Sequence, residues 1–166
     1  MTTKSERQAV LDRAAFLLGR RDHSTAELRR KLLHPRSPKV PIPEEATVDE
    51  ALERLTDLGL LDDARFAREL SRTLTERKGI SPAVLRFELR RRGLEDGVVE
   101  DVLTEAEEMD PVARIEELLQ TKFARKAADE RGRRAAFAAL LRLGYRHTDI
   151  RRAMRETGWP LPGEGM

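Results

Sequence analysis

The sequence predicts an all-α protein in which three tandem three-helix repeats form an elongated, curved array. Aromatic residues make up only 4% of the chain, so the core must consist mainly of aliphatic residues, among which Leu and Ala favour helices. Few segments alternate apolar and polar residues as half-buried strands do. A pattern of apolar residues at helical spacing also recurs along the chain every 51 residues.

The third helix of each predicted repeat carries the clearest copy of this pattern. Val48, Val99 and Ile150 each begin a segment with apolar residues at positions i, i+3 and i+4, which lie on one face of a helix. The second helices share an apolar pair four residues apart: Leu28 and Leu32, Leu85 and Leu89, Ala136 and Leu140. The first helices are expected at 7–20, 63–77 and 111–127. We therefore expect the repeats at 1–60, 61–109 and 110–157.

Residues typical of helix starts stand at the borders of these segments. In a capping box, a Ser or Thr hydroxyl and a Glu side chain three residues later satisfy free backbone amides. Two pairs fit this pattern: Ser24 with Glu27, and Thr47 with Glu50. Two more candidate caps precede a proline: Ser81 and Asp110. Asp62 and Asp63 stand just before a helical segment, so we expect them to cap a helix rather than to act as paired catalytic carboxylates.

Glycines and prolines indicate where the helices end. Five glycines stand where a positive φ would be tolerated after a helix: Gly19, Gly59, Gly79, Gly93 and Gly144. The density of prolines between His34 and Pro43 predicts an inserted loop in the first repeat, because proline cannot continue a helix. Residues 158–166 form a C-terminal tail whose Trp159 is expected either to hang loose or to dock on the last repeat.

Charge is segregated along the chain although the formal net charge is only +2. Residues 65–92 contain nine basic and three acidic residues, whereas 93–110 contain eight acidic residues and no basic one. Residues 122–155 are basic again, with eleven basic and three acidic residues. Basic faces attract polyanions or acidic protein grooves. The alternative is that these charges keep the protein soluble and form ion pairs between neighbouring helices.

Several classes of protein are disfavoured. The chain has no Cys, which excludes disulfides, thiolate metal sites and cysteine nucleophiles. His23, His34 and His147 lie too far apart to show a metal-ligand spacing. Phosphate-binding and catalytic motifs are also missing, so we expect neither an enzyme nor a cofactor or metal. The absence of a long apolar run or a leader-like N-terminus predicts a cytoplasmic protein that does not bind membranes.

The central segment resembles the RecX family. Its signature runs from Gly59-Leu60-Leu61-Asp62-Asp63-Ala64-Arg65-Phe66-Ala67 through Arg72 to Gly79-Ile80-Ser81-Pro82 and Gly93. Ser24-x-x-Glu27-Leu28-Arg29-x-Lys31-Leu32 is also similar to the family pattern. The match is specific over 7–103 and looser from Asp110 onward. The loop from His34 to Pro43 is longer than the family's linker, and Phe87 lies on the polar side of its helix.

This resemblance implies a regulator of the RecA recombinase. Members of the family bind RecA and its nucleoprotein filament on DNA, lie in the filament groove, and modulate recombination and DNA repair, most often by inhibition. We expect a monomer with no catalytic activity, in which basic faces also contact single- or double-stranded DNA. Phe87 is either a further contact for the partner or covered by a neighbouring unit.

Basic residues are the candidate binding site, since arginine binds carboxylates and phosphates in a bidentate manner. The candidates are Arg65, Arg68, Arg72, Arg77, Lys78, Arg86, Arg90, Arg91, Arg92, Arg133 and Arg134. The alternative is a solvated face whose arginines pair with the acidic third helices. Two other functions remain open: a helix-turn-helix-like DNA-binding protein that acts without RecA, and a helical scaffold for another partner.

Overall fold

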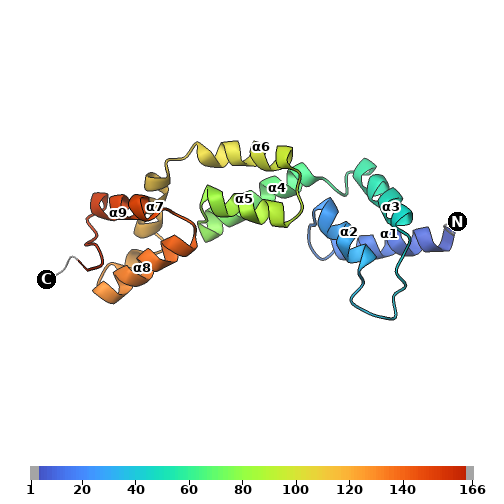
Figure 1. Cartoon of the computed structure of the whole chain (residues 1–166), viewed down its shortest axis with the longest axis horizontal. Helices are drawn as coiled ribbons and strands as arrows, with labels where there is room; N and C mark the ends of the chain where they lie inside the picture. The colour runs from blue at the N-terminus through green and yellow to red at the C-terminus, as the bar shows by residue number, and fades with distance from the viewer. Residues whose placement is uncertain (1–3, 164–166) are drawn as a thin grey trace. The chain divides into compact units, whose positions relative to one another are not determined.

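The chain folds into helices. The computed structural model describes residues 4–163, and within that range it contains no strand, which confirms the all-α prediction (Figure 1). Its α-helices are α1 Lys4–Leu18, α2 Thr25–Leu33, α3 Glu45–Asp57, α4 Asp63–Arg72, α5 Pro82–Arg91, α6 Asp96–Glu107, α7 Pro111–Gln120, α8 Glu130–Arg142 and α9 His147–Glu156. A π-helix, η1 (Thr73–Lys78), continues α4, and a 3₁₀-helix, η2 (Ala124–Lys126), precedes α8.

The helices group into two compact units. The N-terminal unit comprises the chain up to Leu70 together with Leu89–Val99, and the C-terminal unit comprises Ser71–Glu88 and the chain from Glu100 onward. The borders between the units fall inside α4, α5 and α6. The division into three repeats at 1–60, 61–109 and 110–157 therefore stays a prediction.

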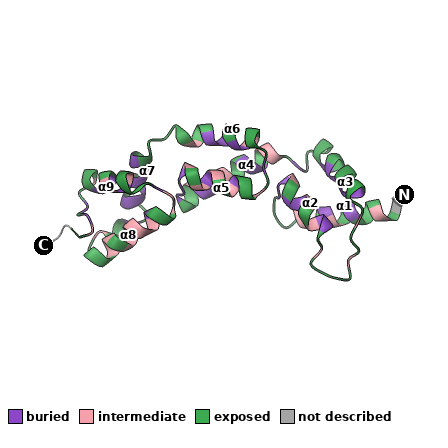
Figure 2. Ribbon diagram, in the orientation of Figure 1, coloured by how far each residue is buried: buried purple, intermediate pink, exposed green. Residues whose placement is uncertain are grey.

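The core of the N-terminal unit lies where α1, α2 and α3 meet. The apolar faces of these helices are buried, as Figure 2 shows by colour. The core contains Val10, Ala14, Leu28, Leu32, Val48, Ala51, Leu52 and Leu55. Each buried Leu or Val contributes about 1.5–3 kcal/mol relative to an exposed side chain, and this burial explains why Leu28, Leu32 and Val48 recur at helical spacing.

The core of the C-terminal unit lies among α7, α8 and α9. Its central residues are Ile115, Leu119, Ala136, Leu140, Ile150 and Met154. Trp159, which is 9% exposed, and Leu161, which is 4% exposed, belong to the same core, and the Trp159 amide donates to the Met154 carbonyl at 2.7 Å. The part of the C-terminal segment that the structure describes is thus docked on these helices. Of the two alternatives for Trp159, docking is therefore the one observed, and Trp159 does not hang loose.

The predicted cap at Thr47 is wrong. Helix α3 begins at Glu45, with Glu44 in the cap position, so Thr47 is a buried residue inside the helix. The Glu44 amide donates to the Glu6 carboxylate of α1 at 3.0 Å. This tertiary contact supports an earlier helix start than the local hydroxyl pattern indicates. Ser24 does cap α2, because its hydroxyl accepts the Glu27 amide at 3.1 Å, but the Glu27 side chain turns to arginines instead of closing the capping box.

Other boundaries follow the sequence more closely. Asp110 accepts the Val112 amide at 3.0 Å and Asp62 accepts the Arg65 amide at 2.9 Å, as expected of capping residues. The helix predicted at 111–127 is shorter, because α7 ends at Gln120, where the Thr121 hydroxyl donates to the Glu117 carbonyl. Gly19 does not adopt the positive φ expected of it, whereas Gly59, Gly79, Gly93 and Gly144 do.

Candidate partner-binding surfaces

Helix α4 presents three of the predicted basic residues to solvent. The Asp62 cap fixes the start of the helix, and Arg65, Arg68 and Arg72 are all exposed on it. The Arg65 guanidinium donates to the Gly59 carbonyl at 3.3 Å, and Arg72 also interacts inside the protein. Arg68 has no side-chain partner within residues 4–163. It is therefore the α4 cation most open to a carboxylate or phosphate from outside.

A second group of cations lies where η1 ends. Arg77 and Lys78 are exposed, and neither side chain has a partner in the part of the chain that the structure describes. The Lys122 ammonium donates to the Lys78 carbonyl at 2.7 Å. Arg77, Lys78 and Lys122, which we call the η1 patch, thus bring three positive charges to one end of this helix. Lys122 is missing from the predicted site because it lies 44 residues away and no local pattern connects it with Lys78.

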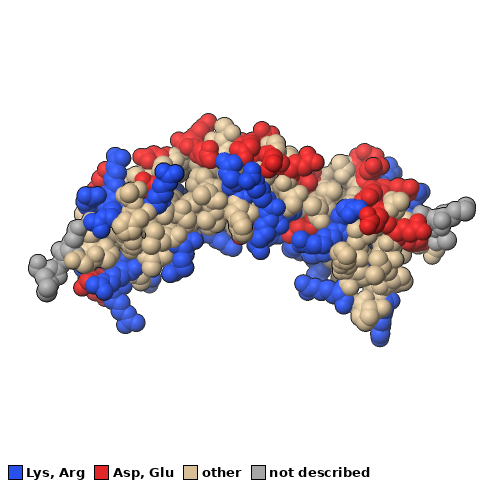
Figure 3. All heavy atoms as spheres, in the orientation of Figure 1, with Lys and Arg blue, Asp and Glu red and all other residues tan. Residues whose placement is uncertain are grey.

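The arginines of α5 are largely paired with acids of α6. Arg86 pairs with Glu100 and, at 3.3 Å, with Glu107, while Arg90 pairs with Asp96 at 3.2 Å. Figure 3 shows the acidic side chains gathered over α6 and basic ones beside them over α5. Arg91 also interacts within the protein. Ion pairs between neighbouring helices, the structural alternative for the segregated charge, are therefore present here, and exposed pairs of this kind contribute about 0–1 kcal/mol each.

Arg92 differs from the other α5 arginines because it faces a buried acid. Its guanidinium donates to the Glu27 carboxylate at 2.9 Å, and the Glu27 side chain is only 6% exposed. Arg21 contacts the same carboxylate at 3.3 Å, and the Ser24 hydroxyl donates to the Arg92 carbonyl. Burial alone would raise the pKa of Glu27, but the hydrogen bond from Arg21 and the charge of Arg92 outweigh it and lower that pKa. Arg92 thus helps to hold α2 against the turn that follows α5.

Further polar residues near α2 have structural partners that the sequence does not reveal. His23 is buried, with Nδ1 2.8 Å from the Arg21 carbonyl and Nε2 2.8 Å from the Lys31 ammonium. Burial, together with the charges of Arg21 and Lys31, lowers the pKa of His23. The Asp63 carboxylate accepts from the Thr25 amide at 2.8 Å, so it caps α2 rather than its own helix. No group of three or more His, Asp or Glu residues suited to a metal occurs among the described residues.

Helix α8 carries the last two predicted site residues. Arg134 is exposed and pairs with Glu130 one turn away. Arg133 is half-buried, and its guanidinium donates to the Ala127 carbonyl at 3.1 Å, while its Nε is buried without a hydrogen-bond partner. Arg134 is therefore paired and Arg133 partly buried, whereas Arg77 and Lys78 of the η1 patch are exposed and have no side-chain partner in the described range. Phe87, which is 64% exposed, is the most exposed aromatic side chain in the described range.

The chain is similar to proteins called regulatory protein RecX. The match to that of Pseudomonas entomophila is 39% identical over 126 residues and covers 75% of this chain and 76% of the relative. The match to that of Halorhodospira halophila is 36% identical and covers 88% of this chain and 86% of the relative. Residues 62–103 match the family model of the second three-helix domain of RecX. The crystal structure of RecX from Lactobacillus salivarius has a similar fold, with a TM-score of 0.70, 22% identity and 94% of this chain covered. Within the described range, no helix is long and apolar enough to cross a membrane.

Proposed function

Because the chain belongs to the RecX family of regulatory proteins, we propose that it binds the RecA recombinase and its filament on DNA and inhibits recombination. The observation that carries this proposal is the similarity to RecX proteins over most of both chains. We further propose that the chain acts as a monomer and without catalysis. Direct contacts with DNA phosphates add to the binding of the protein filament.

Among the candidate residues, we propose that the unpaired cations make the main contacts. Arg68, Arg77 and Lys78 are exposed and have no side-chain partner within residues 4–163, so binding does not require them to give up an internal ion pair. Arg86, Arg90 and Arg134 each face a carboxylate of their own unit. A partner that recruits these paired arginines must first compete with that carboxylate, which reduces their net contribution.

Two triple variants test this ranking with the same change in charge. One variant changes the unpaired residues, Arg68→Gln, Arg77→Gln and Lys78→Gln, and the other changes the paired residues, Arg86→Gln, Arg90→Gln and Arg134→Gln. The affinity for RecA filaments assembled on single-stranded DNA is measured for each, beside the affinity for the same DNA without RecA. We expect the first variant to lose about tenfold in filament affinity and the second less than about threefold. Equal losses, or a larger loss in the paired variant, would remove the ranking.

The structure offers little to favour a DNA-binding protein that acts without RecA. In that hypothesis, α5 would enter the major groove as the recognition helix. Two of its arginines, Arg86 and Arg90, already pair with acids of α6. The affinity for duplex DNA, measured without RecA, distinguishes the two functions, because a protein of this second kind would bind bare duplex DNA at least as tightly as the filament.

A further inference from the structure

The N-terminal unit carries a group of positive charges around the C-terminal end of α2, outside the residues considered so far. We call Arg21, Arg30, Lys31 and Arg36 the α2 cation cluster. Burial and the charges of its other three members lower the pKa of Lys31, so the four cations lie within electrostatic range of one another. Arg30 and Arg36 are exposed, and the side chain of neither has a hydrogen bond or ion pair within residues 4–163. A polyanion can therefore bind both arginines without displacing a partner of theirs.

The acid nearest to this cluster is already in use. Glu27 is the acid that raises the pKa of Lys31, but its side chain is buried and pairs with Arg21 and Arg92. The Lys31 ammonium lies 2.8 Å from Nε2 of His23, whose lowered pKa leaves the ring uncharged at neutral pH. The cluster thus has more positive charge than its surroundings neutralise.

Stabilisation of α2 explains only part of this arrangement. Arg30 and Lys31 stand in the last turn of α2, where cations suit the negative end of the helix dipole. Arg21 and Arg36 lie outside the helix, so the dipole does not account for their presence. Asp22, the acid that follows Arg21, lines a small cavity beside residues of α4.

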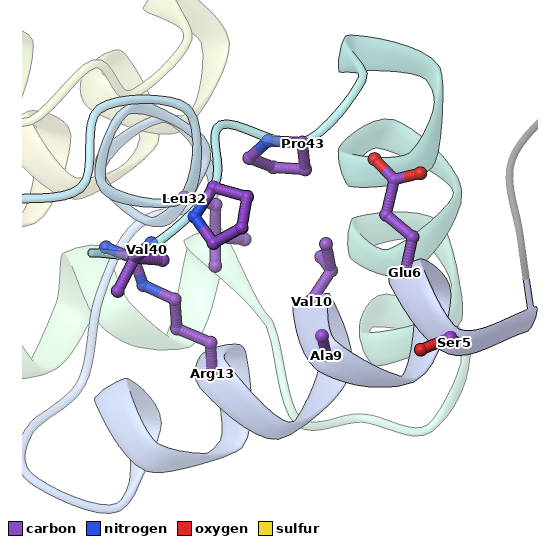
Figure 4. A pocket seen from close by; sticks show the side chains of 9 residues that line it. Ser5, Glu6, Ala9, Val10, Arg13, Leu32, Val40 and Pro43 are labelled. Carbon is purple, nitrogen blue, oxygen red and sulfur yellow. The ribbon is translucent and has the colours of Figure 1, made fainter. Parts of the chain in front are cut away.

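An exposed aromatic ring lies next to the cluster. Phe16 of α1 is 63% exposed, and the guanidinium of Arg20 lies 5.8 Å from the centre of its ring. Arg13 shares this face of α1, because it precedes Phe16 by three positions and Arg20 by seven. Arg13 donates to the Lys31 carbonyl at 3.0 Å, and Figure 4 shows Arg13, which lines a cavity between α1 and the loop, extending toward Val40. The contact with Lys31 brings the Phe16 face of α1 to the end of α2.

An exposed ring beside unpaired cations is the combination that binds single-stranded nucleic acid. In such sites the cations follow the backbone, and bases stack on the aromatic side chain. An unpaired strand can offer a base to the ring, whereas the bases of a duplex are stacked on one another. An acidic protein surface would use the cations and leave the ring without a role. Asp12, one turn before Phe16, accepts a hydrogen bond from the Gln8 side chain at 2.8 Å, so its charge is partly satisfied within α1.

We propose that Phe16 and the α2 cation cluster form a binding site for single-stranded DNA, in which a base stacks on Phe16 and neighbouring phosphates bind Arg30 and Arg36. The exposed Arg20 adds a further charge beside the ring. The proposal deepens the DNA contacts of the proposed function and rests on them, but it assigns them to a different surface, in the N-terminal unit. It also adds stacking, which contacts with phosphates alone do not provide.

Two probes separate stacking from charge in experiments without RecA. One is a fluorescently labelled oligothymidylate of about 12 nucleotides, and the other is an abasic strand with the same number of phosphates. Binding to the full-length protein is measured by fluorescence anisotropy. We expect the affinity for the oligothymidylate to be at least about fivefold higher, because the abasic strand has no base to stack on Phe16.

Variants of two exposed phenylalanines test the ring. Phe16→Leu keeps an apolar side chain and is expected to weaken oligothymidylate binding at least about fivefold while leaving abasic binding unchanged. Phe16→Trp, which restores an aromatic face, is expected to retain the affinity. The control is Phe87→Leu, because Phe87 is similarly exposed but stands on α5, where Arg86 and Arg90 already pair with acids. Its affinity should equal that of the wild type.

Two double variants with the same change in charge test the cations. Arg30→Gln with Arg36→Gln is expected to weaken the binding of both probes by about tenfold or more at about 0.1 M salt. It should also reduce the log–log salt slope by about 1.4, the value for two phosphate contacts on a single strand. The control is Arg7→Gln with Arg29→Gln, whose guanidinium groups pair with carboxylates of α3. We expect this control to lose less than about threefold and to keep its salt slope. Circular dichroism checks that all variants remain helical.

Several results would overturn the proposal. Equal binding of the two probes by the wild-type protein would exclude stacking, and this comparison does not depend on any variant. Equal losses in the two double variants would indicate a nonspecific effect of charge, and duplex DNA bound as tightly as the oligothymidylate would exclude a single-strand site. If Arg30→Gln with Arg36→Gln weakened binding to RecA filaments but not to the oligothymidylate, the cluster would belong to an acidic protein surface. Oligothymidylate binding as expected, without any effect on RecA, would support this site and contradict only the proposed function.

Discussion

Replacing Arg92 by Met should destabilise the N-terminal unit by about 2 kcal/mol. Removing one partner of a buried ion pair costs about 3–5 kcal/mol when the remaining charge is left uncompensated. Here the compensation is partial, since Arg92 is 26% exposed and Arg21 still contacts Glu27 at 3.3 Å. The loss should therefore be closer to that of a hydrogen bond to a charged group, about 1.5–3 kcal/mol. Met is chosen because it preserves the packing of the aliphatic stem.

Urea-induced unfolding, followed by circular dichroism, measures this cost. Hydrogen exchange of the α2 amides shows whether the loss is local to the contact between α2 and the turn after α5. The matched control is Arg90→Met, which removes an exposed pair with Asp96 and should cost no more than about 1 kcal/mol. In addition, Glu27→Gln should cost less in the Arg92→Met background than in the wild type, because the two side chains act as a pair. Surface substitutions usually change stability by less than about 0.5 kcal/mol. A cost for Arg92→Met within that range, or an equal cost for Arg90→Met, would refute the conclusion that Arg92 stabilises the fold through Glu27.

Three further substitutions test the fold and its electrostatics. Gly93→Ala should destabilise the protein by more than about 1 kcal/mol in urea unfolding, because Gly93 has φ +75° and a Cβ at this position would lie 2.5 Å from the Cβ of Ala26. The cost should be smaller in an Ala26→Gly background, and equal costs in the two backgrounds would contradict the steric argument. His23 should make stability fall as the pH is lowered from about 7.5 to about 5.5, because its lowered pKa means that the unfolded chain takes up the proton at a higher pH than the folded chain does. His23→Gln should flatten this dependence, and an unchanged pH profile would show that His23 does not contribute. Tyr145→Phe should cost about 1 kcal/mol in thermal or urea unfolding, because it removes the buried hydrogen bond to the Gly79 carbonyl, and a neutral effect would mean that the carbonyl finds another partner.

Features that depend on neighbouring residues were predictable from the sequence. The helices and their apolar faces follow from local periodicity, and the caps at Ser24, Asp62 and Asp110 need only residues two or three positions away. Ion pairing between α5 and α6, the alternative to partner binding, could be considered from the sequence because a basic segment is followed directly by an acidic one. Arg86 and Glu100, for example, lie only 14 residues apart.

Features that depend on distant residues were not predictable in this way. Glu27 fits a capping box, but its carboxylate binds Arg92, which lies 65 residues further along the chain. Similarly, the Glu6 carboxylate of α1 accepts a hydrogen bond from the Glu44 amide. This contact favours the start of α3 at Glu45, whereas the local pattern indicated a start after Thr47. The candidate site shows the same limit: composition identifies the arginines, but only the contacts separate the paired from the unpaired ones.

The most direct test of the proposed function is the effect of the intact chain on RecA-driven DNA strand exchange. Increasing amounts are added to RecA filaments assembled on single-stranded DNA, and strand exchange and DNA-dependent ATP hydrolysis are measured together with binding to the filament. We predict that the chain binds the filament and that both activities fall as it does so. An unchanged rate of strand exchange and ATP hydrolysis, with no binding to the filament, would contradict the proposal that this protein regulates RecA.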